Sequence, residues 1–467
     1  MLFSSITFLF YFLPIVIALY FIIPKKYLWF RNLALLAASL IFYSWGEPIY
    51  VFLMIYSACF NWYMAREIEK SRERGSTGRA DLVFTIAVDV MILCFFKYFS
   101  FVMDNINALT GLDIHYTALA LPIGISFYTF QAMSYIFDVY RKKVRAQRSL
   151  FKFALYLSFF PQLIAGPIVK YRDIEKQLSS RKTTLEGFGD GASRFIVGLG
   201  KKVLLANNLG ALQASVLALP DSSISAASYW IGAFAFTMQI YFDFSGYSDM
   251  AIGLGRMFGF KFNENFDHPY ISSTITDFWR RWHISLSTWF REYLYYPLGG
   301  NRVSVPRHIV NLFIVWALTG LWHGANWTFV AWGLYYCVVL IFEKYVYGKA
   351  LQKAPAAVGH IYTMLIVSIG WVIFMSDSIR DALTYLKTCF LLGGYPLFNT
   401  STLFFLRTSI ILMAVSVLCS TEIPSKTLTR LKEKLPVAWL AVIFAIFVLS
   451  TAYLLYSTYN PFLYFRF

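Results

Sequence analysis

Charged side chains are scarce in this sequence. Asp, Glu, Lys and Arg make up 14% of its 467 residues, against about 25% in an ordinary soluble domain. Hydrophobic residues reach 58% and aromatic residues 19%, which is more apolar surface than a water-soluble fold can hide. The composition therefore excludes an ordinary soluble domain and predicts an integral membrane protein.

Several catalytic and metal-binding patterns are also missing. The sequence has no P-loop, no Gly-rich dinucleotide fingerprint and no HExxH pair. It has no GxSxG motif, which argues against a serine esterase of the soluble type. Its five Cys form no CxxC pair, so buried packing is favoured over metal or disulfide roles. We expect no metal site.

Basic residues are in excess and unevenly distributed. Lys and Arg number 41 against 25 Asp and Glu, and no motif of a nucleic-acid reader appears. The first, third and fifth predicted loops carry Lys or Arg, whereas the loops near 46–48 and 103–118 carry none. Cytoplasmic loops collect such residues, so the alternation places the N-terminus outside the cell membrane.

Apolar runs that approach the roughly 20 residues of a spanning helix recur along the whole chain. We expect about eleven true spans, with the other runs re-entrant or interfacial. The first run, 4–23, is followed by Lys25 and Lys26 and preceded by no basic residue, the reverse of a secretory signal. The runs lie at 4–23, 30–45, 49–65, 81–102, 119–139, 153–169, 192–218, 226–258, 308–321, 325–346, 360–376, 402–421 and 437–458.

One run contains helix breakers. Pro161, Gly166 and Pro167 interrupt the stretch 153–170. Non-helical backbone at membrane depth occurs where it is buried in protein or faces a water-filled cavity. The segment is therefore either such a break or a kinked packing helix.

His323 is a candidate general base. It lies between two apolar stretches in Leu318–Trp332, and an ionisable group at membrane depth indicates a functional site. An imidazole has an ordinary pKa of about 6.5, which suits proton transfer. Gly320 and Gly324 allow another backbone or a thin acyl chain to approach. The alternative is a His that joins two helices by hydrogen bonds.

A second candidate is His283, within the polar region 259–307. Arg280, Arg281 and Arg291 surround it in sequence and suit an anionic, phosphate-bearing donor. The neighbouring aromatic residues Trp279, Trp282 and Phe290 are expected at the membrane interface. The alternative is a solvated basic helix beside the membrane.

Other polar residues in apolar runs have two interpretations. Asp138, which follows Gln131 by seven residues, and the pair Asp243 and Asp249 are either ties between helices or the lining of a substrate path. The remaining histidines, His115, His268, His308 and His360, are expected to be solvated or interfacial.

The segments that carry these candidates resemble the membrane-bound O-acyltransferase (MBOAT) family. The signature is Asp277–Arg302 followed by Leu321-Trp-His-Gly-Ala-Asn-Trp327. Three further segments, 121–131, 160–167 and 241–255, resemble the bacterial alginate O-acetyltransferase branch. Many relatives have a His-Gly pair where this chain has Tyr336-Cys337, so no third histidine is expected.

The resemblance implies an all-α fold: a ring of membrane helices around a thin core, in one domain over 1–467. N-terminal helices would occupy 1–152, the catalytic core 153–345 and C-terminal helices 346–467. It implies a multi-pass protein of the bacterial cytoplasmic membrane. Within that fold, His323 and His283 would be catalytic.

The implied reaction moves an acetyl group from cytoplasmic acetyl-CoA to an extracytoplasmic polysaccharide, through a partner of the SGNH-hydrolase type. Residues that would contact donor or acceptor are Arg280, Arg281, Arg291, Trp282, Asn326, Trp327, Asp243 and Gln131. One alternative is D-alanyl transfer from a carrier protein to teichoic acid. Another is a solute transporter, which needs a repeat that this sequence does not show.

Overall fold

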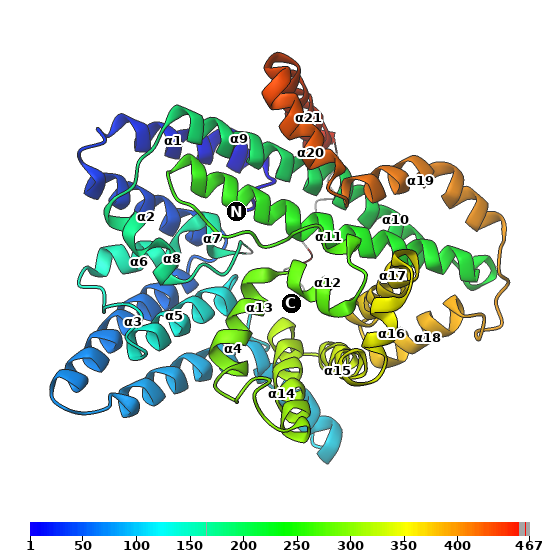
Figure 1. Cartoon of the computed structure of the whole chain (residues 1–467), viewed down its shortest axis with the longest axis horizontal. Helices are drawn as coiled ribbons and strands as arrows, with labels where there is room; N and C mark the ends of the chain where they lie inside the picture. Colours follow the sequence, from blue (N-terminus) through cyan, green and yellow to red (C-terminus); the bar gives the residue numbers. More distant parts are fainter. Residues whose placement is uncertain (165, 457–462, 464–467) are drawn as a thin grey trace. The chain divides into compact units, whose positions relative to one another are not determined.

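The computed structural model describes residues 1–164, 166–456 and 463 (Figure 1). These residues form helices and no strands, which confirms the all-α class. The chain forms two compact units, the first from Met1–Phe195 with Ser248–Asn263 and the second from Ile196–Tyr247 with Glu264–Phe467. The single membrane domain stays a prediction, and each unit is described by itself.

The first unit contains the N-terminal helices. Their bounds are η1 Phe8–Phe12, α1 Leu13–Ile22, α2 Leu28–Ser44, α3 Tyr50–Glu73, α4 Arg79–Thr110, α5 Ile125–Tyr140, α6 Leu150–Ser158, α7 Phe160–Leu163 and α8 Tyr171–Ser179. It also includes the first part of α9, Leu185–Gly200, and the last part of α11, Ala226–Met257.

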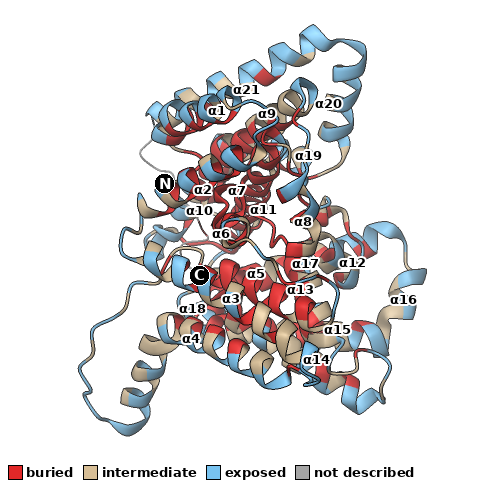
Figure 2. Ribbon diagram, turned by 90° about the vertical axis from the view of Figure 1, so that its left-hand side faces the viewer, coloured by how far each residue is buried: buried red, intermediate tan, exposed pale blue. Residues whose placement is uncertain are grey.

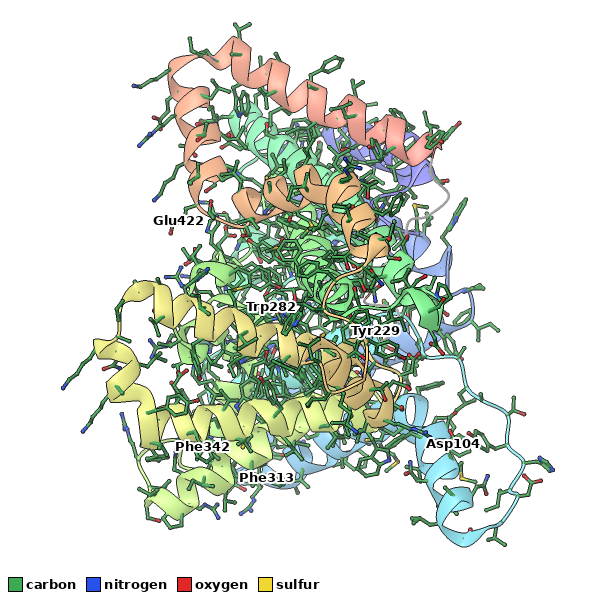
Figure 3. The ribbon with its side chains drawn as sticks, turned by 90° about the vertical axis from the view of Figure 1, so that its right-hand side faces the viewer. Asp104, Tyr229, Trp282, Phe313, Phe342 and Glu422 are labelled. Atoms are coloured by element: carbon green, nitrogen blue, oxygen red, sulfur yellow. The ribbon has the colours of Figure 1, made fainter. Side chains whose placement is uncertain are left out.

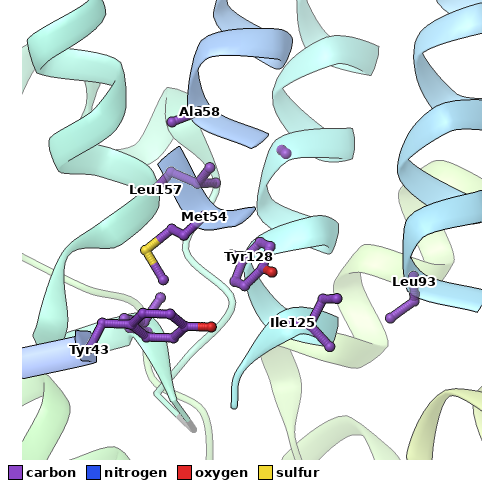
Figure 4. Packing of buried hydrophobic residues seen from close by; sticks show 9 residues of the cluster. Tyr43, Met54, Ala58, Leu93, Ile125, Tyr128 and Leu157 are labelled. Atoms are coloured by element: carbon purple, nitrogen blue, oxygen red, sulfur yellow. The ribbon is translucent and has the colours of Figure 1, made fainter. Parts of the chain in front are cut away.

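Helix α5 is the buried centre of this unit. It packs against α3, α4 and α6, and almost every one of its side chains is buried. Figure 4 shows one cluster around it, in which Ile125 and Tyr128 of α5 lie among Met54 and Leu157 of neighbouring helices. The helix therefore buries polar as well as apolar residues, and Gln131 and Asp138 are among its buried polar side chains.

The stretch 153–170, for which a non-helical break and a kinked packing helix were both left open, is not one continuous helix. Helix α6 ends at Ser158, and α7 is a single turn with Pro161 in its first turn. A Cβ at Gly166 would lie 2.9 Å from Cα of Gln162 and 3.2 Å from Cβ of Ala251. The chain therefore passes through a space that admits no side chain at this point.

The second unit holds both candidate histidines. Its further elements are η2 Lys201–Ala206, α10 Asn207–Leu217, η3 Asp221–Ser223, η4 Pro269–Ile271, α12 Ile275–Arg281, α13 Ile284–Phe290, η5 Arg291–Tyr295, α14 Val305–His323, α15 Trp327–Phe342, η6 Glu343–Tyr347, α16 Gly348–Lys353, α17 Ala356–Met375, α18 Ile379–Cys389, α19 Thr400–Cys419, α20 Ile423–Lys434 and α21 Pro436–Tyr456.

Burial differs strongly between these helices. Figure 2 shows α11 largely buried and α20 and α21 largely exposed. Helix α21 is apolar along its whole length, yet only Ile443 and Ser450 of its side chains are buried. Apolar side chains that no protein covers fit a helix that contacts lipid.

Among the described residues, seven helical stretches are long and apolar enough to cross a membrane, and Phe8–Ile22 and Leu28–Ser44 are shorter apolar helices. The estimate of about eleven spans and the outward N-terminus stay predictions. The seven are Arg79–Thr110, Leu185–Leu217, Val305–His323, Trp327–Lys353, Ala356–Met375, Thr400–Cys419 and Pro436–Tyr456.

Candidate active site

Helices α14 and α15 form a tight hairpin that positions His323. A Cβ at Gly320 would lie 2.3 Å from the carbonyl oxygen of Phe329, and one at Gly333 would lie 2.3 Å from that of Trp316. The two backbones therefore touch where each helix carries a glycine, as small residues permit in membrane helices. The close approach of another backbone, expected at Gly320, is confirmed, and the hairpin buries His323 at the last residue of α14.

Aromatic rings enclose the His323 imidazole. The centroids of Trp322, Trp332 and Phe374 lie 5.0, 5.1 and 5.3 Å from that of His323, each with its plane steeply inclined to the imidazole. Such edge-to-face contacts hold a ring in one orientation. Phe374 comes from α17, in a part of the chain that the sequence analysis assigned no role.

His283 lies at the junction of α12 and α13. Its backbone is left-handed, with φ of 44°, a conformation that is uncommon for residues other than Gly, although His is among the residues enriched there. Its Nδ1 lies 3.1 Å from Oδ1 of Asn265, while its Nε2 has no hydrogen-bond partner among the described residues. Burial lowers the pKa of His283 well below its usual range, so the ring is neutral.

One cavity contains both histidines. Its volume is about 290 Å³, room for a small acyl group on a slender chain. Its walls are mostly apolar, which excludes water from a reacting thioester. The lining residues are Thr276, Trp279, Arg280, Trp282, His283, Leu286, Ser287, Phe290, Arg291, Tyr295, Leu312, Val315, Trp316, Thr319, His323 and Leu340.

The cavity is positively charged where it meets solvent. Arg280 and Arg291 line it and are exposed, and neither forms an ion pair with any described residue. Arg281 does not line it: its Nε lies 3.0 Å from Asp277 and its Nη1 3.4 Å from Asp267. Of the three arginines expected on the donor side, the structure brings two to the cavity and pairs the third with acids.

Glu343 fixes the start of the helix that carries Arg280. Its carboxylate accepts hydrogen bonds from the backbone N–H groups of Ile275 and Thr276, at 2.8 and 2.9 Å, and from the Thr276 hydroxyl. These are unsatisfied groups of the first turn of α12, and a negative charge there is favourable. Glu343 is thus a positioning residue for α12, and no motif in the sequence indicated it.

Asn326 and Trp327, which were expected to contact the donor or the acceptor substrate, have other surroundings in the structure. The Asn326 side chain caps α15 by accepting from Thr328 N at 3.0 Å, and its amide donates to the Asp377 carbonyl at 2.9 Å. The Trp327 side chain is exposed. Neither residue lines the cavity, so their contact with an acceptor stays a prediction.

Asp243 and Gln131 are each buried away from solvent. Asp243 Oδ1 lies 2.6 Å from Nζ of Lys202 in the second unit, which favours the tie between helices. Gln131 lies on α5 in the first unit and is fully buried. In the same unit, Arg194 pairs with Asp249 at 2.9 Å and Arg172 lies 3.7 Å from Asp138.

Two expectations about location were wrong. Trp282 and Phe290 were expected at the membrane interface but are buried, and the ring of Trp282 packs at a tilt of 47° against Trp371 of α17, with centroids 4.8 Å apart. Figure 3 labels Trp282 within the unit and Phe313 and Phe342 on the exposed faces of α14 and α15. Packing of α12 against α15 and α17 turns its aromatic face inward.

His308 was expected to be solvated or interfacial and is instead buried. Tyr295 and Tyr345 lie 2.8 Å from its Nε2 and Nδ1 respectively. The two phenol groups replace water at both ring nitrogens, which makes burial of this histidine tolerable. Since Tyr295 also lines the cavity, His308 supports the wall beside Arg291.

Known proteins resemble the chain across this site. The sequence profile of the MBOAT, membrane-bound O-acyltransferase, family matches residues 77–379, a range that includes both histidines and the whole lining of the cavity. The chain belongs to the membrane-bound O-acyltransferase family. It is therefore an O-acyltransferase and an integral membrane protein, which disfavours the solute-transporter alternative.

Three relatives extend the MBOAT match over most of the chain. It is 43% identical to the probable alginate O-acetylase of Azotobacter vinelandii, covering 90% of this chain and 84% of that one. It is 40% identical to the probable alginate O-acetylase of Pseudomonas putida, covering 100% of each chain. A peptidoglycan O-acetyltransferase of Helicobacter pylori is 35% identical, with 86% and 82% covered.

Proposed function

We propose that this MBOAT transfers an acetyl group from acetyl-CoA toward hydroxyl groups of an extracytoplasmic polysaccharide. One observation carries the proposal: a single cavity joins two buried imidazoles to two exposed, unpaired guanidinium groups. Arginines without acidic partners suit the phosphates of a nucleotide-bearing thioester. A polysaccharide acceptor is supported by relatives named for O-acetylation of alginate and of peptidoglycan.

The proposed step uses His323 as general base. The imidazole takes the proton of an acceptor hydroxyl as the oxygen attacks the thioester carbonyl. A carbon–oxygen bond forms, the carbon–sulfur bond breaks, and the proton passes to the departing thiolate. Enclosure of His323 by three aromatic rings keeps water from competing with the acceptor.

The proposed arrangement in the cell follows from charge. With the N-terminus outside, the basic loops face the cytoplasm, where acetyl-CoA is available. The acyl group is then delivered to the opposite side of the bacterial cytoplasmic membrane. We propose that a partner of the SGNH-hydrolase type receives it there and acetylates the glycan.

The test uses purified protein in lipid nanodiscs, radiolabelled acetyl-CoA and the extracytoplasmic partner. We expect label transfer by the wild type and a loss of about 10² to 10⁴ in rate for His323→Ala, the usual contribution of a positioned base. His360→Ala is the matched control, because His360 is exposed and lies outside the cavity. Equal rates for His323→Ala and wild type contradict the role of His323.

A wild-type protein that is folded but transfers no acetyl label contradicts the donor. The same assay with a D-alanyl thioester on a small acidic carrier protein then tests the alternative donor. Transfer from the carrier alone would replace acetyl-CoA in the proposal.

A further inference from the structure

We propose that Asn265 is a positioning residue that holds His283 in the tautomer protonated at Nδ1, so that Nε2 presents a lone pair to the cavity as a second proton acceptor beside His323. This inference rests on the proposed function for its kinetic consequence. The geometry of Asn265, Ser285 and His283 stands independently of the donor and the acceptor.

The orientation of the Asn265 amide is determined by a backbone group. The N–H of Ser285 donates to the Asn265 side chain at 3.2 Å, and a backbone N–H has no acceptor function. The atom that it meets must therefore be Oδ1, because the alternative amide orientation would place two donors together. The Ser285 hydroxyl donates to the same oxygen at 2.8 Å.

The tautomer of His283 follows from that assignment. Its Nδ1 lies 3.1 Å from Oδ1 of Asn265, and two lone pairs at this distance would repel each other. Nδ1 therefore carries the proton and donates it. In a neutral imidazole the other nitrogen is then an acceptor, and Nε2 has no protein partner among the described residues.

Asn265 also holds the backbone that aims this ring. Its carbonyl accepts from the Ile284 N–H at 2.9 Å, so its main chain and side chain together satisfy the first two N–H groups of α13. His283 directly before them has the left-handed φ of 44°, which persists only where neighbouring contacts enforce it. Asn265 is fully buried, and its position is therefore determined by packing.

The surroundings of His283 favour its neutral form. Phe244 and Phe266 contact the ring, with centroids 4.7 and 6.4 Å away. The titratable groups that share its cavity are Arg280, Arg291, Tyr295 and His323. No carboxylate of the described part of the chain lines the cavity, and the nearby acids Asp267 and Asp277 are paired with Arg281. Burial and positive neighbours both lower the pKa of an imidazole.

The experiment compares acetyl transfer as a function of pH in wild type, Asn265→Asp and Asn265→Leu. Asp keeps the acceptor and adds a negative charge, which raises the pKa of His283 by about 1–3 units. The titration of His283 itself, followed by nitrogen NMR in the same pH series, therefore moves up by about 1–3 pH units in the Asp variant. Leu removes the acceptor, and we expect kcat to fall about 10²-fold at every pH.

Asn399→Asp is the matched control. Asn399 caps α19 through its Oδ1, which accepts from Thr402 N at 3.0 Å, and it does not line the cavity. Asp is an equally good cap, so the titration of His283 stays at the wild-type pH. A His283 titration that does not move in Asn265→Asp overturns the proposal, as does one that moves equally in Asn399→Asp.

A second measurement separates this proposal from the proposed function. The chain has six histidines, so nitrogen NMR of histidine-labelled protein resolves few rings, and His283→Gln identifies the His283 signal. We expect a protonated Nδ1 and an unprotonated Nε2 in the wild type, lost in Asn265→Leu. A proton on Nε2 overturns the tautomer, whereas the expected spectrum without acetyl transfer contradicts only the proposed function.

Discussion

The buried cluster around Lys202 and Asp243 and the buried cluster around His283, both in the second unit, differ in how completely their members satisfy one another. In the first, Lys202 Nζ lies 2.6 Å from Asp243 and 2.9 Å from Asn207. The other Asp243 oxygen accepts from the backbone N–H of Leu463 at 3.0 Å. Opposite charges meet, and both carboxylate oxygens are engaged within the protein.

In the second cluster, Asn265 engages only Nδ1 of His283, and Nε2 has no hydrogen-bond partner in the part of the chain that the structure describes. That ring lines the cavity that also contains His323, whereas Asp243 does not line this cavity. In sequence the two residues differ, since Asp243 lies in the apolar run 226–258 and His283 in the polar region 259–307. The comparison shows that a buried polar residue is a candidate catalytic residue when one of its polar atoms has no hydrogen-bond partner in the protein and faces a cavity.

The largest expected effect concerns the second cluster, which contains His283. His283→Gln removes the acceptor at the cavity but keeps a polar side chain of similar length, so we expect acetyl transfer to fall about 10² to 10⁴-fold. The midpoint of thermal unfolding should stay close to that of the wild type. A variant that loses stability and activity in parallel would show that this cluster is as structural as the other one.

In the first cluster, which contains Lys202 and Asp243, substitution should lower stability and not activity. Asp243→Leu leaves the buried Lys202 ammonium group without the carboxylate that neutralises it. We therefore expect a loss of about 3–5 kcal/mol of unfolding free energy, measured by denaturation in mixed micelles. The double variant Lys202→Met with Asp243→Leu should recover most of that loss, because no charge stays buried. If the double variant is stable but inactive, Asp243 has a role in catalysis and the comparison fails.

The next effect concerns Glu343, the residue that positions α12. Glu343→Ala removes a charged acceptor from two backbone N–H groups of α12, and each such bond contributes about 1.5–3 kcal/mol. Because α12 carries Arg280 and Trp279, we expect the KM for the donor to rise together with the loss of stability. Glu343→Gln keeps one acceptor oxygen and should fall between wild type and Glu343→Ala; if it equals Glu343→Ala, the capping explanation is wrong.

The smallest effect separates two consecutive arginines. Arg280→Gln removes an unpaired charge at the cavity, and we expect the donor KM to rise about tenfold, which corresponds to about 1.4 kcal/mol. Arg281→Gln breaks partly exposed ion pairs with Asp277 and Asp267, worth about 0–1 kcal/mol, and should leave that KM unchanged. Equal effects of the two variants on donor KM would contradict the assignment of the cavity as the donor site.

Local sequence signals identified the class of the protein and its central residues. Apolar runs of spanning length predicted a helical membrane protein, and the chain is all-helical with apolar helices that fit a bilayer. The motifs around His283 and His323 predicted an O-acyltransferase, and family membership confirms it. These features depend on residues that are contiguous in the chain, so no knowledge of packing was needed.

The choice between neighbouring residues depended on the tertiary structure. Consecutive helical residues point about 100° apart, and only the packing of α12 decides that Arg280 faces the cavity and Arg281 faces Asp277. The interface position expected for Trp282 was wrong for the same reason, since α17 covers it.

The residues that support the site were likewise invisible in the sequence. Asn265 precedes His283 by 18 residues, and Glu343 follows Thr276 by 67. Hydrogen-bond partners at such separations are selected by the fold and not by local propensity. The sequence by itself thus determined which side chains are able to transfer protons or bind charged groups. The tertiary structure decided which atoms of these side chains are hydrogen-bonded within the protein and which face a substrate. The physical reason is that burial and hydrogen-bond partners depend on how distant segments pack together.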